Sequence, residues 1–359
     1  MCSLASPDHR SDPAAWARRL GIAREAVELY LASDVIDLHV DSFIWKRLGV
    51  YDPTQRHGSG LFDARFYSHT DLPRLREARV TGALWVITTN PFRSAAGRAH
   101  AFTENLRRLR DLLVACPGDV LVARTAADYA AARAADKHAA FIAVQGGNAF
   151  GGDAATLERA GDAVVLVTLV HLSTSPVGTS SFPVNLRRGE GLTPLGIELV
   201  RQLNAQRIFV DLAHINRRGF FDAVAAHDRS QPLVVSHTGV SGVHPHWRNV
   251  DDGQLRAVAD TGGVVGVIYE YGFLGDGRSK GAALVVDHLQ HVVHTVGEDH
   301  AALGSDWDGL ITTPRDMPTC LELPRLVQLM LDRGFGEGCI RKILGGNFLR
   351  ALGQLRGAA

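Results

Sequence analysis

The amino-acid sequence predicts a (β/α)8 barrel. Short apolar runs alternate with helical segments about eight times along the chain, and this alternation is typical of a parallel sheet. Metal-ligating residue types stand at the carboxyl ends of many of these runs. A (β/α)8 barrel gathers the carboxyl ends of its strands at one rim, where its active site lies. An open doubly wound sheet is the alternative, but no glycine-rich phosphate loop follows the first run.

The composition is that of an ordinary folded protein, and the chain is expected to form one barrel domain. The 359 residues are 46% hydrophobic and 21% charged, and they show no internal repeat or linker. We therefore expect an N-terminal arm and helix at 1–34 and a single barrel domain at 35–359. A formal net charge of zero argues against nucleic acid or an anionic membrane as partner. The four cysteines are scattered, which indicates neither a disulfide framework nor a zinc ribbon.

The targeting signals of a secreted or membrane protein are not expected. The first 20 residues carry charges and lack an apolar segment of the secretory type. No uncharged apolar stretch approaches the length of a membrane span. A cytoplasmic location is the simplest expectation.

The expected strands are short apolar runs, as in a sheet buried on both faces. They lie at 35–41, 82–88, 140–145, 164–171, 208–214, 233–237, 264–269 and 301–306. Helical spacing of apolar residues predicts helices between them, at 15–33 (as one or two), 72–78, 99–115, 126–135, 154–160, 193–205, 219–226, 252–261, 285–296, 321–332 and 337–344. Thr193 and Pro194 are the N-cap and first residue expected of a helix start.

Two long connections are expected over the carboxyl ends of the strands. The segment 46–70 is mixed in composition, and its histidines His57 and His69 are expected to be solvated. The segment 172–191 is rich in Ser, Thr, Pro and Gly and is a candidate active-site loop.

His39 and Asp41 end the first strand. Side chains two residues apart on a strand point the same way, so two metal-ligand types project together there. The other candidates also stand at strand ends, and any one of them alone could equally be a satisfied core residue. The full set is His39, Asp41, Gln145, His171, His214, His237 and Asp306. Imidazole and carboxylate ligands without thiolate suit a catalytic zinc ion or another divalent transition metal.

The chain resembles the membrane (renal-type) dipeptidases, zinc peptidases with an amidohydrolase-like barrel of the metallo-dependent hydrolase type. The resemblance runs from about residue 35 to 352. It rests on Asp37-Leu-His-Val-Asp41, Leu192-Thr-Pro-Leu-Gly196, Val210-Asp-Leu-Ala-His214, Ser236-His237 with Arg248-Asn-Val250, Gly304-Ser-Asp-Trp-Asp-Gly309 and Gly345-Gly-Asn-Phe-Leu349.

The resemblance implies a role for each site residue. His39 and Asp41 would bind one zinc ion, and His214 and His237 a second. His171 would contact the substrate and help polarise the scissile carbonyl. Arg248 would hold the C-terminal carboxylate of the substrate, a task suited to a guanidinium. Asp306 would take a proton from the metal-activated water and pass it to the leaving amine.

Gln145 departs from the family pattern. The family has a metal-bridging Glu at this position, whereas this chain reads Val144-Gln145-Gly-Gly-Asn. A carboxylate bridge offsets part of the repulsion between two dications, and a neutral amide does not. We therefore expect one metal ion, or a second that binds weakly, with zinc first among the divalent metals.

Three functional hypotheses follow. The first is a zinc dipeptidase that cleaves dipeptides or similar small amides with a metal-activated water. The second is a related amidase or lactam or ester hydrolase, suggested by Gln145 and by Tyr269-Glu-Tyr271, which differs from the usual form in the family. The third is a non-catalytic member that binds a peptide-like ligand. A small peptide-like partner is common to all three, and a homodimer is possible in this family.

Overall fold

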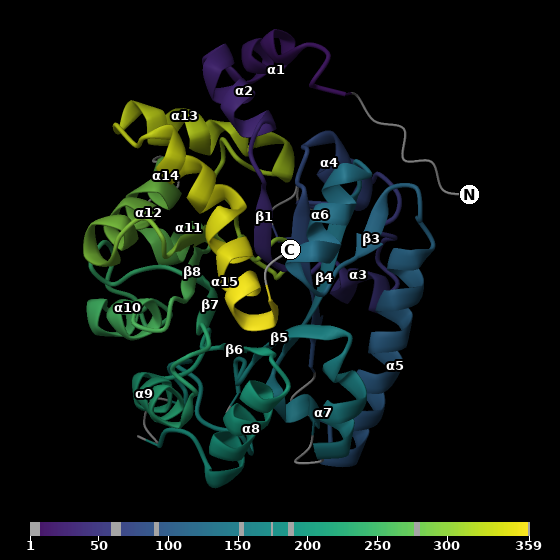
Figure 1. Cartoon of the computed structure of the whole chain (residues 1–359), viewed down its shortest axis with the longest axis vertical. Coiled ribbons are helices and arrows are strands. Elements are labelled where there is room, and N and C mark those ends of the chain that lie inside the picture. The colour runs from purple at the N-terminus through teal and green to yellow at the C-terminus, as the bar shows by residue number, and fades with distance from the viewer. Residues whose placement is uncertain are drawn as a thin grey trace.

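The computed structural model of the protein describes residues 8–58, 66–89, 93–150, 154–173, 175–185, 190–275 and 281–357. Within these ranges, eight parallel strands form a closed ring (Figure 1). In ring order they are β2 Gly82–Thr88, β1 Ile36–Val40, β9 Ala301–Leu303, β8 Val264–Val267, β7 Val234–Thr238, β6 Phe209–Asp211, β5 Val164–Thr168 and β4 His138–Gln145. Pairing of β2 with β4 closes the ring, so the predicted (β/α)8 barrel is confirmed.

A short additional strand lies outside the ring. β3 Val120–Val122 pairs in parallel with the start of β4, from Val120 opposite His138 to Val122 opposite Ala140. This strand is not among those expected from the sequence. Three residues are too few to show a strand period, and here the partner strand supplies the hydrogen bonds.

Helices surround the barrel. They are α3 Phe43–Arg47, α4 Leu72–Glu77, α5 Ala95–Val114, α6 Ala126–Ala134, α7 Ala154–Gly161, α8 Pro194–Ala205, α9 Arg217–Ala226, α10 Asp252–Ala259, α11 Tyr271–Leu274, α12 Ala283–Val296, α13 Pro324–Asp332 and α14 Glu337–Arg341. The predicted start of α8 is confirmed, because the Thr193 side chain accepts a hydrogen bond from the Gly196 backbone N–H. Each of the described helices is too short or too polar to cross a membrane.

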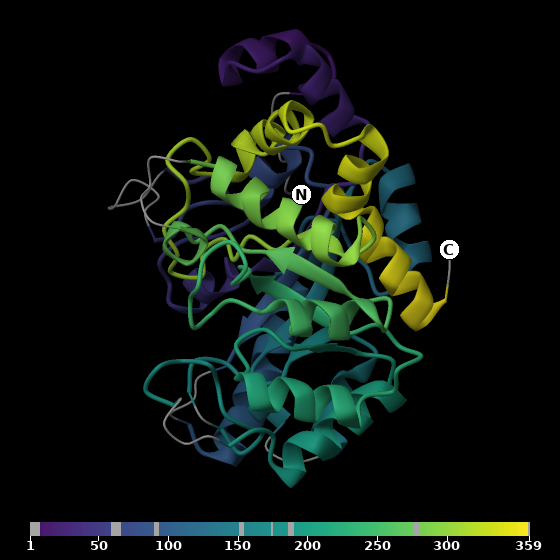
Figure 2. The ribbon, with the colours of Figure 1, turned by 90° about the vertical axis from the view of Figure 1, so that its left-hand side faces the viewer.

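Two N-terminal helices stand apart from the ring. α1 Pro13–Leu20 and α2 Arg24–Leu31 protrude at one end of the molecule (Figures 1 and 2). Trp16 and Tyr30 are fully buried between them and the body, and α2 packs against α13. A contiguous apolar core of this kind fixes the position of the arm on the barrel.

The last helix, α15 Asn347–Arg356, covers the amino-terminal mouth of the barrel. Its Phe348 packs edge-on against Phe141 of β4, with ring centroids 5.4 Å apart. Its Arg356 donates to the carbonyl of Val164, the first residue of β5, and its Arg350 donates to the carbonyl of Gly262, just before β8. The opposite, carboxyl-terminal mouth therefore remains as the place for a site.

The segment after β1 folds tightly onto the end of β9. His69 is fully buried, and its backbone N–H donates to Asp308 Oδ1 at 2.8 Å. The expectation that His69 is solvated is therefore wrong. A long polar segment gives no local sign of the distant carboxylate that draws it inward. His57, which was also expected to be solvated, is half-buried.

Candidate metal centre and active site

The carboxyl ends of four strands bring five candidate ligands together. His39 lies in β1 and His237 in β7, whereas His214 lies in the loop after β6 and Asp306 in the loop after β9. His39 Nε2 lies 3.6 Å from Asp41 Oδ2 and 3.7 Å from Asp306 Oδ1. Donor atoms of His39, His237 and Asp306 lie within 4.8 Å of one another, and all three residues are buried. His214 Nε2 is 2.8 Å from His237 Nε2.

The remaining candidates border this cluster. The His171 ring stands edge-on to the His214 ring, with centroids 4.7 Å apart. Gln145 is the last residue of β4 and is 2% exposed, and its side-chain oxygen has no hydrogen-bond partner in the described part of the chain. Arg248 Nη2 donates to the His237 carbonyl at 2.7 Å. Thus the histidines and acids predicted from separate strand ends meet at one rim.

Buried residues beside the ligands hold them in place. Asp211 accepts hydrogen bonds from the backbone N–H groups of Ala213 and Ser236. The Ser236 hydroxyl donates to Asp211 Oδ2 and lies 2.8 Å from His237 Nδ1. Such a contact orients an imidazole so that Nε2 faces the site.

Asp37 has the same function on β1. It accepts from the backbone N–H of His39 at 2.9 Å and from that of Ser305 at 3.1 Å, and so ties β1 to the segment that carries Asp306. Asp37 and Asp211 are not among the site residues expected from the sequence. Their signal was an Asp two or three residues before a ligand histidine in both quoted motifs.

Backbone strain marks two of the site residues. His214 has φ +65° and Asp306 has φ +63°. Both values lie in the left-handed region, which residues other than glycine rarely adopt. Such conformations cost about 1–3 kcal/mol and persist where surrounding structure enforces them. In this protein they aim an imidazole and a carboxylate at the centre of the rim.

Burial dominates the electrostatics of the cluster. It raises the pKa of Asp306 to about 8, a rise that His39 opposes and Asp41 reinforces. Burial lowers the pKa of His171 to about 4 and those of His214 and His237 well below their usual value. His39 is the exception, because Asp41 and Asp306 outweigh its burial and raise its pKa. His171, His214 and His237 are thus neutral imidazoles, and they lie beside acids that burial leaves poorly solvated.

These residues fit a divalent cation. Both ring nitrogens of His39 lack a hydrogen-bond partner among the described residues although the side chain is fully buried. Ligands about 2.1 Å from one tetrahedral ion lie about 3.4 Å apart, close to the separations of His39 from Asp41 and Asp306. A buried, unpartnered nitrogen facing two carboxylates is costly without a cation to bind it.

A small cavity opens beside the cluster. It has a volume of about 250 Å³, and His214, Trp247 and Arg248 are among its lining residues. The Trp247 ring contacts Phe182 and Phe273, with centroids 5.4 and 5.7 Å apart. The mouth of the site therefore combines the buried guanidinium group of Arg248 with the aromatic ring of Trp247.

The chain is similar to known peptidases along almost its whole length. The family model described as membrane dipeptidase (peptidase family M19) matches residues 23–359. A protein from the pqqA 5′ region of Klebsiella pneumoniae is 35% identical over 259 residues, which cover 69% of this chain and 94% of that protein. Dipeptidase aclJ of Aspergillus oryzae is 28% identical over 356 residues, 95% of this chain and 83% of its own.

A solved structure agrees in fold. The crystal structure of a metallo peptidase from Rhodobacter sphaeroides, liganded with a phosphinate mimic of the dipeptide L-Ala-D-Ala, matches with a TM-score of 0.78 at 26% identity. The match covers 90% of this chain and 99% of that one. The chain therefore belongs to the membrane dipeptidase family, peptidase family M19.

Proposed function

We propose that this peptidase hydrolyses dipeptides or similar small amides with a single divalent metal ion, zinc first among the candidates. The observation that carries the proposal is a buried group at the carboxyl-terminal rim, where donor atoms of His39, His237 and Asp306 lie within 4.8 Å of one another. Asp41 Oδ2 lies 3.6 Å from His39 Nε2, and His214 Nε2 lies 2.8 Å from His237 Nε2. His39, Asp41, His214 and His237 would hold the ion, with Asp306 beside it. The relatives support the reaction class, since one is a dipeptidase and another binds a dipeptide mimic.

The absence of a charge on Gln145 favours a single bound ion. This residue ends β4, and its buried amide oxygen has no hydrogen-bond partner among the described residues. A bridging carboxylate would be needed there to hold two dications close together. An amide oxygen can still contribute to the binding of one ion. Both Nε2 atoms must be unprotonated to bind, so the proton between His214 and His237 would have to move to a ring Nδ1 when the metal binds.

The acid–base work falls to Asp306. A bound divalent cation supplies Lewis acidity, which lowers the pKa of water toward neutrality and polarises a carbonyl. A cation beside Asp306 would favour its ionised form, and the carboxylate would then take the proton from the attacking water and return it to the leaving amine. Its strained backbone and its position 3.7 Å from His39 Nε2 direct the carboxylate toward the centre of the cluster.

Two cationic or polar side chains would position the substrate. Arg248 is 3% exposed, and no carboxylate of the described residues pairs with it, so its guanidinium is suited to the C-terminal carboxylate of a dipeptide. Burial lowers the pKa of Arg248 to about 10, which leaves it charged at neutral pH. His171, neutral and beside His214, would donate a hydrogen bond to the scissile carbonyl oxygen.

The test is metal content together with turnover. Protein purified without added metal and without a histidine tag is measured by inductively coupled plasma mass spectrometry. Hydrolysis of L-Ala-L-Ala and L-Ala-D-Ala is then followed before and after chelation. We expect about one metal per chain and turnover that chelation abolishes and zinc restores.

Other results would change the assignment. About two zinc ions per chain would show that Gln145 still supports a binuclear centre. Metal without dipeptide turnover would favour an amidase or lactam or ester hydrolase. Ligand binding without turnover of any amide, even in excess zinc, would favour the non-catalytic hypothesis.

A further inference from the structure

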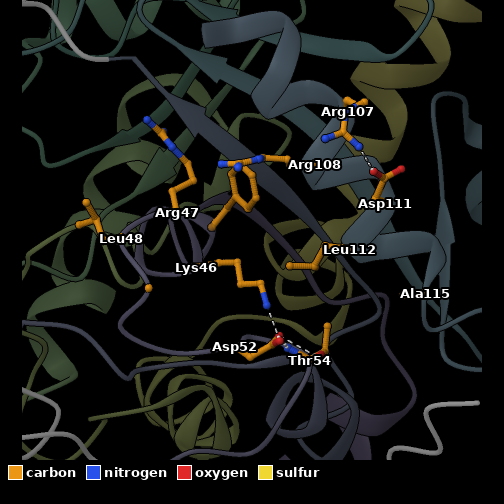
Figure 3. Close-up of a pocket in the computed structure, with 12 residues that line it drawn as sticks. Lys46, Arg47, Leu48, Asp52, Thr54, Arg107, Arg108, Asp111, Leu112 and Ala115 are labelled. Carbon is orange, nitrogen blue, oxygen red and sulfur yellow. Dashed lines mark hydrogen bonds and ion pairs between the residues drawn. The ribbon is translucent and has the colours of Figure 1, made fainter.

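A basic recess adjoins the carboxyl end of β2, across the ring from Arg248. Two adjoining cavities, of about 670 and 460 Å³, open between α3 and α5 and share Arg47, Leu48 and Arg108 in their walls. The second cavity also reaches Arg93 and the β2 residue Thr88. Figure 3 shows Arg47, Arg108 and Lys46 around the first cavity.

The acids of the recess already have partners. Asp52 pairs with Lys46, and Asp111 with Arg107, as the dashed lines in Figure 3 show. Glu104 is shared between Arg107 and Arg108. Five lysines and arginines therefore face three acids across the two cavities. In the described part of the chain, Arg47 and Arg93 have no carboxylate within ion-pair distance.

Arg47 is linked to the metal centre through Thr88. It is half-buried, and its Nη1 donates to the Thr88 carbonyl at 2.7 Å. The hydroxyl of the same Thr88 donates to Asp41 Oδ1 at 2.6 Å. Burial lowers the pKa of Arg47, the Asp41 carboxylate opposes this, and the charges of Arg93 and Arg108 lower it further. Three guanidinium groups therefore lie close enough to repel one another.

The topology places this recess across the barrel from Arg248. Arg248 lies in the loop after β7, and Thr88 ends β2. Four steps around the ring separate β7 from β2 in either direction. A dipeptide whose C-terminal carboxylate binds Arg248 and whose amide bond lies at the centre must direct its N-terminal residue toward β1 and β2.

We propose that the recess binds the carboxylate side chain of an N-terminal glutamate or aspartate, so that the preferred substrates are acidic-Xaa dipeptides. The proposal rests on the function proposed above and names its substrate class. Arg47 and Arg93 would supply the charge-assisted hydrogen bonds. A neutral side chain in the same place would leave the guanidinium groups without a partner.

The experiment compares an isosteric pair of substrates. The metal-loaded protein is assayed for kcat/KM with L-Glu-L-Ala and with L-Gln-L-Ala, which differ in one charge. We expect L-Glu-L-Ala to be preferred about tenfold or more, and the preference to shrink as ionic strength rises. The ratio of the two values is the readout, because it cancels any loss of active protein.

Three variants locate the effect. Arg93→Gln, which contacts no ligand of the metal centre, should reduce the ratio severalfold. Arg47→Gln should reduce it further. Arg110→Gln is the matched control, because Arg110 is exposed on the same helix α5 outside both cavities, and it should keep the wild-type ratio. A wild-type ratio near one, or variants that leave it unchanged, would overturn the proposal.

Failure of this proposal can be told apart from failure of the proposed function. Turnover of L-Gln-L-Ala without a preference for L-Glu-L-Ala rejects the acidic subsite and keeps the dipeptidase. If neither peptide is cleaved, calorimetric binding of the two still tests the recess, and equal affinities reject it. Stabilisation by inorganic phosphate that Arg93→Gln abolishes, without any preference between the peptides, would assign the recess to a free anion instead.

Discussion

Single side chains decide the chemistry of this site. Asp306 and Gln145 differ from their surroundings in one respect each. The first is a strained acid turned toward the cluster, and the second is a buried neutral amide at the end of β4 whose oxygen has no hydrogen-bond partner among the described residues. Their roles can be tested by changes of one or two atoms that leave shape nearly intact.

Asp306→Asn keeps the volume of the side chain and removes its capacity to accept a proton. We expect kcat for dipeptide hydrolysis to fall by about 10²–10⁴-fold, the usual contribution of a general base. Metal content should stay at the wild-type value. Asp332→Asn, at an exposed acid on α13, is the control. Turnover within twofold of wild type would remove Asp306 from the proposed role.

Gln145→Glu adds one negative charge where the family places its bridge. We expect the number of bound metal ions per chain to rise toward two, because a carboxylate offsets repulsion between neighbouring dications. Mass spectrometry of the purified variant measures it. Gln145→Met, similar in length and uncharged, should give no rise. Unchanged metal content in Gln145→Glu would show that the account of the bridge is wrong.

At the scale of elements, Asp308 joins β9 to the segment that follows β1. Its carboxylate accepts from the hydroxyls of Ser42 and Tyr51 and from the backbone N–H of His69. Its carbonyl accepts from Trp45 Nε1. Burial raises the pKa of Asp308, but the His69 imidazole, with Nδ1 3.3 Å from Asp308 Oδ1, and the two hydroxyls outweigh it, so the pKa is lowered. These hydrogen bonds explain how a polar segment is held over the rim without a core of its own.

Asp308→Asn replaces an acceptor oxygen by an amide that only donates. At least one hydroxyl then loses its partner in a buried place, so we expect the free energy of unfolding to fall by about 2–4 kcal/mol. Urea denaturation measures the change. Ser42→Ala removes one donor and should cost about 1 kcal/mol. A loss below that of Ser42→Ala would contradict the central position of Asp308.

At the scale of the whole molecule, buried neutral histidines make stability sensitive to acid. His138, far from the rim at the start of β4, lies with Nδ1 2.8 Å from the Val80 carbonyl, while Trp85 donates to its Nε2 at 3.2 Å. A second ring proton would break the bond from Trp85. Burial lowers the pKa of His138 to about 4.

The sign of the pH effect follows from this lowered pKa. The unfolded chain, with an ordinary histidine pKa near 6.5, takes up the proton first as pH falls. The stabilisation is complete above about pH 6.5 and is lost progressively toward pH 4, by about 3 kcal/mol at most. The free energy of unfolding, measured by urea denaturation at pH values between 4 and 6.5, should change less steeply with pH in His138→Gln than in wild type.

A matched substitution separates this effect from general loss of histidine. His294→Gln changes an exposed histidine on α12 and should keep the wild-type slope. Equal slopes for His138→Gln and wild type would show that His138 does not govern the acid response. The cytoplasmic location and a homodimer stay predictions at this scale.

Local patterns in the sequence determined the eight barrel strands, the capped start of α8 and the ligand types at strand ends. A strand period of two residues places His39 beside Asp41, and Thr193 before Pro194 starts a helix, whatever the rest of the chain does. The tertiary structure alone decided that β2 pairs with β4 and that His69 is buried. It also decided how the chain continues into α15. A helix end was predicted at residue 344, but a π-helical turn, η5 Lys342–Gly346, carries the chain on into α15, which closes the barrel.

Local sequence patterns also do not predict which residues meet at the functional rim. Asp308 and His69 are 239 residues apart in sequence, and Arg47 lies across the ring from Arg248. Hydrogen bonds and charge crowding between such positions depend on ring closure, which brings distant strand ends together. Sequence spacing encodes only neighbours within a strand or a helical turn, so the chain predicts which residues reach the rim, and closure of the barrel decides which of them meet.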